Sequence, residues 1–516
     1  MEGEFLVDQP LSHKLIKKWS WLYLFMILTA PIWYIIRVII SNQLPVADVG
    51  LFYSIIWFII LISLYHDLWL TEALQYYLPK YRIQKKYNDY KTILYLTLIV
   101  QVITWIIIAW IIYFWANWLA INHFHSPEAV GIIKTLCRYF IWINFLQVFN
   151  SVYIAFQDTL YSSLTEFFKV YGILAFTLFF WLSHSLTIQT FNMWWISGVG
   201  IGLIASSIIF FKKYWKTLKH WTIERSKNLV KLQFKYAFRV FLWANVWVLL
   251  WQIDQQLVIN FLWPIQAGYY SNYLSVTTMY IVLTTPLLSL LFPIVTELIT
   301  KRKHKELEIL QNLLYKYFSL LVFTISGLFF ALWPVIATIL FGEKFTYSWY
   351  LISYSAPFLI LHVIYCINYG ILAGMGKVKD RVKILWWALL INIILNVVLI
   401  LVFKIWLVGA VIAVIAWWFV LFFLSFKIVN NHQKINIDWI FLLKNLAIII
   451  LCTLIIYYFQ NHVFVLENNY RWENIKRLFI ILLAYYWIIW GFNYKSFVLL
   501  WKEVKKLRNL SNITQS

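Results

Sequence analysis

The sequence predicts an all-α, polytopic membrane protein with about fourteen transmembrane helices, and three observations support this. Of its 516 residues, 63% are hydrophobic and only 12% are charged, and the mean hydropathy is +0.74. Soluble domains average about 45–50% apolar and about 25% charged residues. The apolar residues form continuous runs that suit bilayer helices of about 20 residues, not the alternating ten-residue segments of a barrel. The basic residues gather in alternate loops. A soluble enzyme, a fibrous protein, a disordered chain and an outer-membrane barrel are therefore excluded.

Each expected span is one apolar run bounded by polar loops. The first begins near Trp19 and is long enough to stay as a helix, so no cleavable signal is expected. The fifth is short as drawn and is expected to begin earlier, near Ser162. In chain order, the predicted spans are residues 19–40, 50–70, 92–114, 131–156, 170–182, 193–211, 237–261, 268–298, 309–341, 348–372, 384–403, 407–426, 441–459 and 478–494.

The net charge of +22 follows from the topology. Of the 43 lysines and arginines, 33 lie in the two terminal segments and the loops that would share one side of the membrane with them. Four loops on the other side, residues 41–49, 115–130, 183–192 and 262–267, contain none. The positive-inside rule then places both termini in the cytoplasm, with the chain in the plasma (inner) membrane. Nucleic acid is not needed to explain the charge.

Motifs for catalysis and cofactor binding are not visible in the sequence. It contains no zinc-ligand spacing, nucleophile elbow, phosphate-cradling glycine loop or nucleotide motif. Cys137, Cys366 and Cys452 lie in apolar runs and are expected to be free thiols. We therefore expect a transporter with no cofactor and no metal, driven by a substrate gradient, the membrane potential or ion coupling.

An internal repeat is visible at an offset of 218 residues. Gly50–Tyr53, which opens the second span, matches Gly268–Ser271, which opens the eighth. Because each repeat has six spans, both should have the same orientation and be related by a pseudo-twofold axis along the membrane normal. We expect an N-terminal six-helix lobe at 1–225 and a C-terminal six-helix lobe at 226–430. Residues 431–516 would add two transmembrane helices and a cytoplasmic tail. The lysine-rich linker 212–236 could form an amphipathic helix.

Five segments carry a resemblance to a known family. The chain resembles oligosaccharide flippases of the Wzx or polysaccharide-exporter type, in the multidrug/oligosaccharidyl-lipid/polysaccharide (MOP) superfamily. The segments are Val49–Phe52, Asp67–Leu74, Ala267–Tyr270, Leu291–Leu298, and Ile391–Asn396 followed by Val408–Ala410.

The resemblance implies a MATE-like fold with a cavity between two lobes. A polyprenyl-pyrophosphate-linked oligosaccharide would cross from the cytoplasmic to the outer leaflet by rocker-switch alternating access, for cell-surface polysaccharide biosynthesis. Membrane lipids and polysaccharide-assembly enzymes are the implied partners. Two alternatives stay open: a multidrug or cation antiporter of the same fold, and a membrane glycosyltransferase or polysaccharide polymerase. The antiporter would favour an acidic cavity, and the enzyme would need larger outer loops than the chain offers.

Basic residues within the spans are the first candidates for substrate binding, because the substrate is anionic. Arg37 could bind phosphate inside the cavity, or its side chain could snorkel to the interface. Lys134 and Arg138, one turn apart, could form a second cationic site or reach the headgroups. Arg239 lies at the inner mouth of the seventh span and is the candidate for first contact with pyrophosphate.

Polar stripes are the second group of candidates, because sugar hydroxyls need a hydrated path. One face of the seventh span carries Asn245, Gln252 and Gln256. The eighth and tenth spans each carry a further stripe. Their serines and threonines could instead hydrogen-bond to their own helices. The candidates on these two spans are Thr278, Thr285 and Ser289 on the eighth and His362 on the tenth.

Three residues are candidates for gating or ion coupling. Asp67 lies beside His66 at the inner end of the second span, where a carboxylate and an imidazole could carry a proton or an ion. Asp254 lies deeper in the membrane, and the 218-residue shift carries Arg37 to its neighbouring position. An Arg37–Asp254 gate across the axis is therefore one hypothesis, although Asp254 points away from the face of Gln252 and Gln256.

Overall fold

The residues that the structure describes are helical between their turns, with no strand among them. This computed structural model describes residues 11–66, 70–156, 158–215, 222–223, 227–244, 246–433, 435, 438–462, 476–477, 479–495 and 498. Within these residues, ten helices are long and apolar enough to cross a membrane. The all-α membrane fold is therefore confirmed, while the count of fourteen spans stays a prediction. Cys137, Cys366 and Cys452 are free and buried, as expected.

The chain divides into two compact units whose boundaries differ from those of the sequence repeats. Unit 1 contains residues 1–274, 340–345 and 385–414, and unit 2 contains residues 275–339, 346–384 and 415–516. Unit 1 therefore includes the whole first repeat and parts of the second. The lobe boundaries at 225 and 430 stay a prediction.

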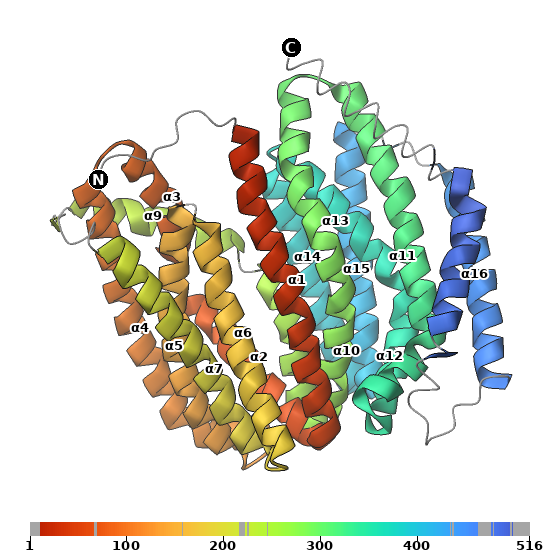
Figure 1. Cartoon of the computed structure of the whole chain (residues 1–516), viewed down its shortest axis with the longest axis horizontal. Helices are drawn as coiled ribbons and strands as arrows, with labels where there is room; N and C mark the ends of the chain where they lie inside the picture. Colours follow the sequence, from red (N-terminus) through yellow and green to blue (C-terminus); the bar gives the residue numbers. More distant parts are fainter. Residues whose placement is uncertain are drawn as a thin grey trace. The chain divides into compact units, whose positions relative to one another are not determined.

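Unit 1 is built on long helices that run side by side (Figure 1). The α1–α2, α4–α5 and α6–α7 turns lie together at one end, which we call the predicted outer end because the charge pattern places it outside. Its elements are α1 (Leu11–Gln43), α2 (Val46–His66), α3 (Leu70–Ile83), α4 (Tyr87–Asn122), α5 (Ala129–Ala155), α6 (Thr159–Leu182), α7 (Ile188–Phe210), η1 (Phe211–Trp215), α9 (Lys227–Ala244), the first part of α10 (Val246–Thr300), η2 (Glu343–Phe345), most of α14 (Val378–Val397) and η4 (Val398–Val402).

Helix α3 is an element that the sequence analysis assigned partly to the second span and partly to a loop. Among the described residues α2 reaches His66 and α3 begins at Leu70, and residues 67–69 lie outside the described residues. The buried residues of α3 recur at helical spacing, with Ala73, Tyr77 and Tyr81 in a core that α4, α5 and α7 also line. This pattern was readable in the sequence, but Lys80 and Arg82 made the segment look like a loop.

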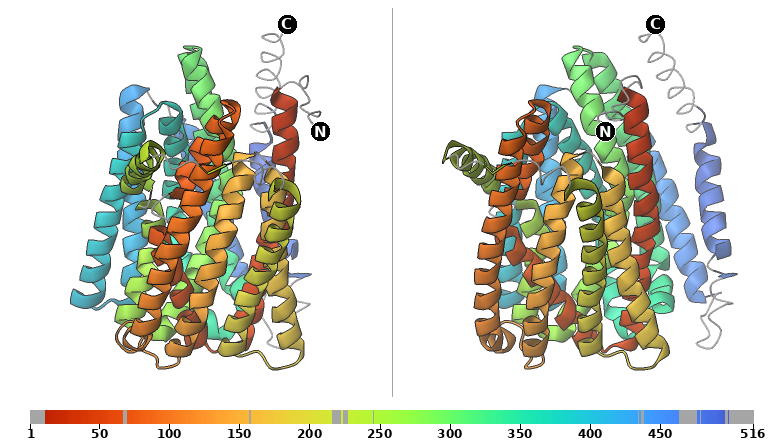
Figure 2. Two further views of the ribbon diagram at one scale, coloured as in Figure 1. Left: turned by 90° about the vertical axis from the view of Figure 1, so that its left-hand side faces the viewer. Right: turned by 60° about the vertical axis from the view of Figure 1, so that its left-hand side comes forward.

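The linker after the sixth span does contain an amphipathic helix, as predicted, but at a shifted position. Helix α9 runs from Lys227 to Ala244, so it includes the first residues of the predicted seventh span. It lies across the ends of its neighbours rather than along them (Figures 1 and 2). Leu229 and Gln233 are buried, and Gln233 Nε2 donates to Thr97 Oγ1 of α4 at 2.6 Å. Lys231 and Lys235 are exposed, as suits a helix in the headgroup region.

The repeat landmarks Gly50 and Gly268 face each other where α2 crosses α10. A Cβ atom on Gly50 would lie 2.1 Å from the carbonyl oxygen of Pro264, and one on Gly268 would lie 2.1 Å from that of Val46. The 218-residue shift that relates the glycines also relates Val46 to Pro264. The two repeats thus exchange the same contact reciprocally, as a twofold relation requires. This local exchange agrees with the pseudo-twofold relation predicted for the two repeats.

Helix α10 combines the predicted seventh and eighth spans, with a break at the expected turn. Trp263 has a φ of 72° and a ψ of 171°, a non-helical conformation that a bulky residue rarely adopts. Pro264 follows it and disfavours the helical conformation at the preceding residue. The chain therefore reverses direction here, which brings Gly268 back to α2.

Unit 2 contains the second part of α10 and a set of helices joined by buried polar contacts. Tyr315 of α11 donates to Asn368 Oδ1 of α13, and Asn368 Nδ2 donates to Ser425 Oγ of α15 at 3.0 Å. The predicted tenth span is interrupted at Ala356–Phe358, where Pro357 lacks the N–H of a continuous helix. The helices are α11 (His304–Phe341), α12 (Thr346–Ser355), η3 (Ala356–Phe358), α13 (Leu359–Gly374), most of α15 (Trp406–His432) and α16 (Trp439–His462).

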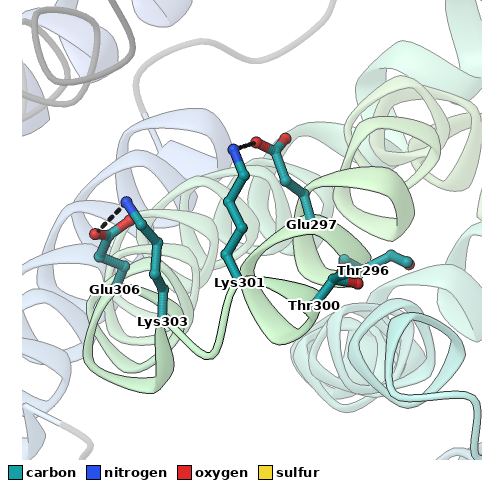
Figure 3. A network of polar contacts seen from close by, with 6 residues as sticks. All are labelled: Thr296, Glu297, Thr300, Lys301, Lys303 and Glu306. Atoms are coloured by element: carbon teal, nitrogen blue, oxygen red, sulfur yellow. Dashed lines mark hydrogen bonds and ion pairs between the residues drawn. The ribbon is translucent and has the colours of Figure 1, made fainter. Parts of the chain in front are cut away.

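Ion pairs neutralise part of the basic turn between α10 and α11. Lys301 pairs with Glu297, and Lys303 Nζ lies 2.8 Å from Glu306 Oε1 (Figure 3). Arg302 sits between these two pairs with a φ of 56°. The surplus of positive charge at this turn is therefore smaller than the sequence alone suggests.

Asp438 caps the N-terminus of α16, the first of the two helices that follow the repeats. Its Oδ1 accepts from the backbone N–H of Phe441 at 3.0 Å, and its Oδ2 lies 3.0 Å from Lys316 Nζ of α11. The Phe441 hydrogen bond, helped by Lys316, lowers the pKa of the Asp438 carboxyl. Because this pKa is lower in the folded state, the stabilisation is present above the unfolded value of about 4 and is lost as the pH falls further.

We expect Asp438→Ala to destabilise unit 2 by about 1 kcal/mol at pH 7, the usual value of an N-cap. Thermal unfolding in detergent would measure the change against wild type. Asp380→Ala serves as the control, because that carboxylate forms none of the ion pairs among the described residues. An equal loss at pH 7 in both variants would contradict the capping role.

Candidate functional site

Arg37 is a buried cation held only by neutral groups. It lies on α1 with 4% of its surface exposed, and its Nη2 donates to Ser271 Oγ of α10 at 2.7 Å. Its guanidinium carbon sits 3.9 Å from the centre of the Tyr53 ring on α2. The side chain therefore points into the protein, which contradicts the alternative that it snorkels to the interface.

Arg37 takes part in none of the ion pairs formed by the described residues. Its Nε is buried and has no hydrogen-bond partner among the residues that the structure describes. A buried charge is costly unless an opposite charge compensates it. Hydroxyl and aromatic partners stabilise the guanidinium only in part, so an anion would add the compensation that they do not supply.

Gln255, not Asp254, is the repeat equivalent of Arg37. Its Nε2 donates to Ser54 Oγ of α2 at 2.7 Å and to the Ala267 carbonyl at 3.1 Å. Arg37 reaches from the first repeat to Ser271 in the second, while Gln255 reaches from the second repeat to Ser54 in the first. The 218-residue shift carries Arg37 onto Gln255, and it carries Ser54 to within one residue of Ser271. Both side chains reach into the other repeat, but Arg37 is charged and Gln255 is neutral. This pair of residues therefore places a positive charge on one side of the pseudo-twofold axis.

Asp254 is a buried carboxylate surrounded by amides and a phenol. It is 2% exposed, and its Oδ1 accepts from Asn396 Nδ2 of α14 at 2.9 Å. Asn392 and Tyr270 also face the carboxylate. Asn396 Nδ2 lies within 3.3 Å of Asn392 Oδ1, so the two amides form one cluster. No lysine or arginine pairs with Asp254 among the described residues.

The hypothetical Arg37–Asp254 gate is not formed in this structure. Arg37 contacts Ser271 and Tyr53, whereas Asp254 contacts the asparagines of α14. The sequence analysis noted that Asp254 points away from the glutamine face, and the structure gives the reason: the carboxylate is turned toward α14. Two buried ionisable groups therefore sit in separate surroundings of neutral side chains.

Gln256 connects the α4–α5 turn to the centre of unit 1. Its Nε2 donates to the Ser54 carbonyl at 3.0 Å, and its Oε1 lies 3.0 Å from His123 Nε2. Burial lowers the pKa of His123, so its ring is neutral at neutral pH. The amide oxygen accepts, so the His123 Nε2–H is the donor. Gln252 is also buried, and within the described part of the chain its Oε1 has no hydrogen-bond partner.

Four other predicted site residues are described in surroundings of their own. Arg138 is exposed, and Lys134 sits 5.0 Å from the ring of the exposed Tyr113, so this cationic pair faces the outside of α5. His362, in unit 2, is fully buried against Trp417 and Trp418. Thr278 donates to the Ser275 carbonyl of its own helix, as one of the alternatives anticipated. Their roles in binding stay predictions.

The remaining predicted site residues lie outside what the structure describes. Asp67 and Asn245 are not among the described residues. Only the backbone is described for His66, Arg239, Thr285 and Ser289, which lie in α2, α9, α10 and α10 respectively.

The sequence analysis missed four residues that the structure brings into this region. Gln255 could have been found by applying the 218-residue shift strictly to Arg37. Asn392 and Asn396 lie in a segment that carries the family resemblance, and their spacing of one helical turn places them on the same face of the helix. His123 gave no signal, because a histidine in a turn reaches the site only through tertiary packing.

The fold is that of MOP-superfamily transporters. The lipid II flippase MurJ in an inward closed conformation superposes with a TM-score of 0.69 at 14% identity, over 93% of this chain and 100% of that chain. An inward-facing multidrug resistance transporter of the MATE family gives 0.67 at 14% identity, over 77% and 93%. A MOP transporter from Pyrococcus furiosus gives 0.55 at 13% identity, over 81% and 95%. The likeness in fold, with the many apolar helices, defines a multi-pass membrane protein with this fold.

The sequence comparisons then give the family. The model of the polysaccharide biosynthesis protein family matches residues 15–299, more than half of the chain. The chain belongs to this family, and the predicted resemblance is confirmed. An uncharacterized membrane protein of Methanocaldococcus jannaschii is 26% identical over 449 residues, which cover 83% of this chain and 87% of the relative. Family and fold together indicate a transporter or flippase rather than an enzyme.

Proposed function

We propose that the protein flips a polyprenyl-pyrophosphate-linked oligosaccharide from the cytoplasmic to the outer leaflet, for cell-surface polysaccharide biosynthesis. The observation that carries this proposal is Arg37, a buried guanidinium whose recorded contacts are with a hydroxyl and an aromatic ring. Pyrophosphate is the anion that such a group would bind by charge-assisted hydrogen bonds. The family's role in polysaccharide biosynthesis and the fold shared with a lipid II flippase support the same substrate class.

Rocker-switch alternating access is the mechanism that we infer. Arg37 would receive the pyrophosphate of the carrier while the sugars follow the polar faces of the spans and the lipid tail stays in the bilayer. The reciprocal crossing at Gly50 and Gly268 supplies a close-packed contact about which the repeats could tilt. We place the chain in the plasma membrane with both termini cytoplasmic, and polysaccharide-assembly enzymes and membrane lipids are its expected partners.

Reconstituted vesicles would test the proposal. Fluorescent polyprenyl-pyrophosphate oligosaccharide in the inner leaflet should become accessible from outside at a protein-dependent rate. Empty vesicles and vesicles with an unrelated membrane protein are the controls. Protein-dependent uptake of a cationic dye with no movement of the lipid would instead support the second candidate, cation antiport. That candidate is favoured by one observation, the buried carboxylate of Asp254.

We further propose that Asp254 couples transport to an ion or proton gradient. A buried carboxylate surrounded by neutral oxygens and amides can alternate between an occupied and an empty state. We expect Asp254→Asn to make the flipping rate independent of an imposed gradient, while wild type responds several-fold. The flipping assay at matched and opposed gradients measures this. Asp89→Asn, outside the cluster at the start of α4, should keep the response. A full response in Asp254→Asn would contradict the coupling role.

A further inference from the structure

The predicted outer end of unit 1 holds two contacts that the 218-residue shift interchanges. The α4–α5 turn of the first repeat reaches the second repeat, where His125 Nε2–H donates to the Asn260 carbonyl of α10 at 2.7 Å. The segment after α11 in the second repeat reaches the first, where Lys344 Nζ donates to the Asn42 carbonyl at 3.1 Å. The shift carries Asn42 onto residue 260, and it carries His125 to within one residue of Lys344.

Both carbonyls lie where the first helix of a repeat ends. The last carbonyls of a helix have no partner within it, so a donor from another segment satisfies them. Each repeat thus uses the turn between its third and fourth spans to cap the first span of the other repeat. This is an exchange, because neither repeat caps its own helix in this way.

Additional contacts accompany the Lys344 hydrogen bond and the His125 hydrogen bond. Lys344 Nζ also donates to the Leu44 carbonyl at 2.6 Å, and Asn42 Nδ2 returns a hydrogen bond to the Leu340 carbonyl at 2.5 Å. On the other side, the His125 ring stacks on Trp263 with 5.2 Å between ring centres. Trp263 is the residue at which α10 breaks, so this contact holds the strained turn of the second repeat against the first.

We propose that these contacts form a pair of reciprocal latches, one at His125 and one at Lys344, that hold the outer ends of the two repeats closed. The inference rests on the proposed alternating-access function and names the groups that must separate when the outer side opens. The two sides differ in strength. A lysine that donates to two carbonyls forms charge-assisted bonds, whereas the imidazole of His125 donates one bond and adds a stacking contact.

The test measures opening without any substrate. Ser54, fully buried and contacted by Gln255 of the other repeat, is replaced by cysteine after Cys137, Cys366 and Cys452 are changed to alanine. A membrane-impermeant maleimide then labels this cysteine only when the outer end opens. Lys344→Met keeps the length of the side chain, and His125→Phe keeps the ring that stacks on Trp263, so each removes only the donor.

We expect Lys344→Met to raise the labelling rate of Ser54→Cys about tenfold and His125→Phe about fivefold. The double variant should approach the product, because both latches bias one equilibrium. Lys344→Arg should keep the slow rate of the parent, since it retains a charged donor. Lys404→Met and His184→Phe are the matched controls, because both residues are exposed at the same predicted end.

Unfolding is distinguished from opening by a second reporter. Ile188→Cys, at the buried start of α7 within the first repeat, should stay unlabelled in every variant. Rates within twofold of the parent in Lys344→Met, His125→Phe and the double variant would overturn the latch. Since no lipid-linked sugar is present, failure of the proposed substrate in vesicles would leave this result unaffected.

Discussion

Arg37→Met should reduce the flipping rate about 10- to 100-fold without lowering the melting temperature. Methionine is similar in length to arginine and keeps the buried site filled, but it cannot hold pyrophosphate. Hydrogen bonds to charged groups contribute about 1.5–3 kcal/mol, which corresponds to a loss of this size. The stability should be unchanged or increased, because the variant no longer has to bury a charge that no described carboxylate pairs with. Transport and thermal unfolding of the same preparation measure both effects.

One further variant separates charge from shape at Arg37, and a second makes the same exchange at another arginine as a control. Arg37→Lys keeps a cation but loses the planar fork, so its rate should lie between those of wild type and Arg37→Met. Arg302→Met makes the same exchange in the turn between α10 and α11, where the residue is exposed, and should leave the rate within twofold of wild type. A large drop in melting temperature for Arg37→Met would mean that the arginine is a structural group, contrary to the binding role.

Gly50→Ala should be one of the most damaging single substitutions in the chain. The added methyl group would lie 2.1 Å from the Pro264 carbonyl oxygen and 2.3 Å from the Gly268 amide nitrogen, both backbone atoms that cannot rotate away. The helices α2 and α10 would have to separate. Overpacking costs about 1–3 kcal/mol even where side chains can adjust, so we expect at least about 3 kcal/mol here. Loss of a monodisperse chromatography peak, together with a lower melting temperature, would show it.

The reciprocal variant and a matched glycine provide the comparison. Gly268→Ala should be similarly damaging, because the same distance separates its Cβ from the Val46 carbonyl. Gly131→Ala lies in α5, where the nearest atom would be 3.7 Å away, and a helical alanine there should be neutral or stabilising. If Gly50→Ala folded as well as Gly131→Ala, the close crossing would be refuted.

The sequence predicted much of the fold because bilayer helices are read from local composition. Continuous apolar runs, the alternation of basic loops and the 218-residue repeat were all visible. Helix α3 and the start of α9 were misplaced because short amphipathic helices at the interface carry charges that resemble those of loops. The turn at Trp263 was expected from its position, but its backbone conformation was not.

The candidate site was less predictable, because it depends on which faces of distant helices meet. Arg37 was singled out because it is a basic residue within a span, but only the packing of the helices shows that its side chain turns inward to Ser271. The 218-residue shift placed the equivalent of Arg37 in the right region of the seventh span. The gate hypothesis used Asp254, which is one position away from the true equivalent, Gln255. His123, His125 and Lys344 lie in turns, where neither hydropathy nor helical spacing carries information about their long-range partners.

The most direct test of the central claim, that Arg37 binds a lipid pyrophosphate, is the dissociation constant of a short-chain polyprenyl pyrophosphate. Wild type, Arg37→Met and Arg302→Met would be compared in detergent by equilibrium binding. We expect saturable binding to wild type and to Arg302→Met, and at least tenfold weaker binding to Arg37→Met. Equal dissociation constants for wild type and Arg37→Met would contradict it.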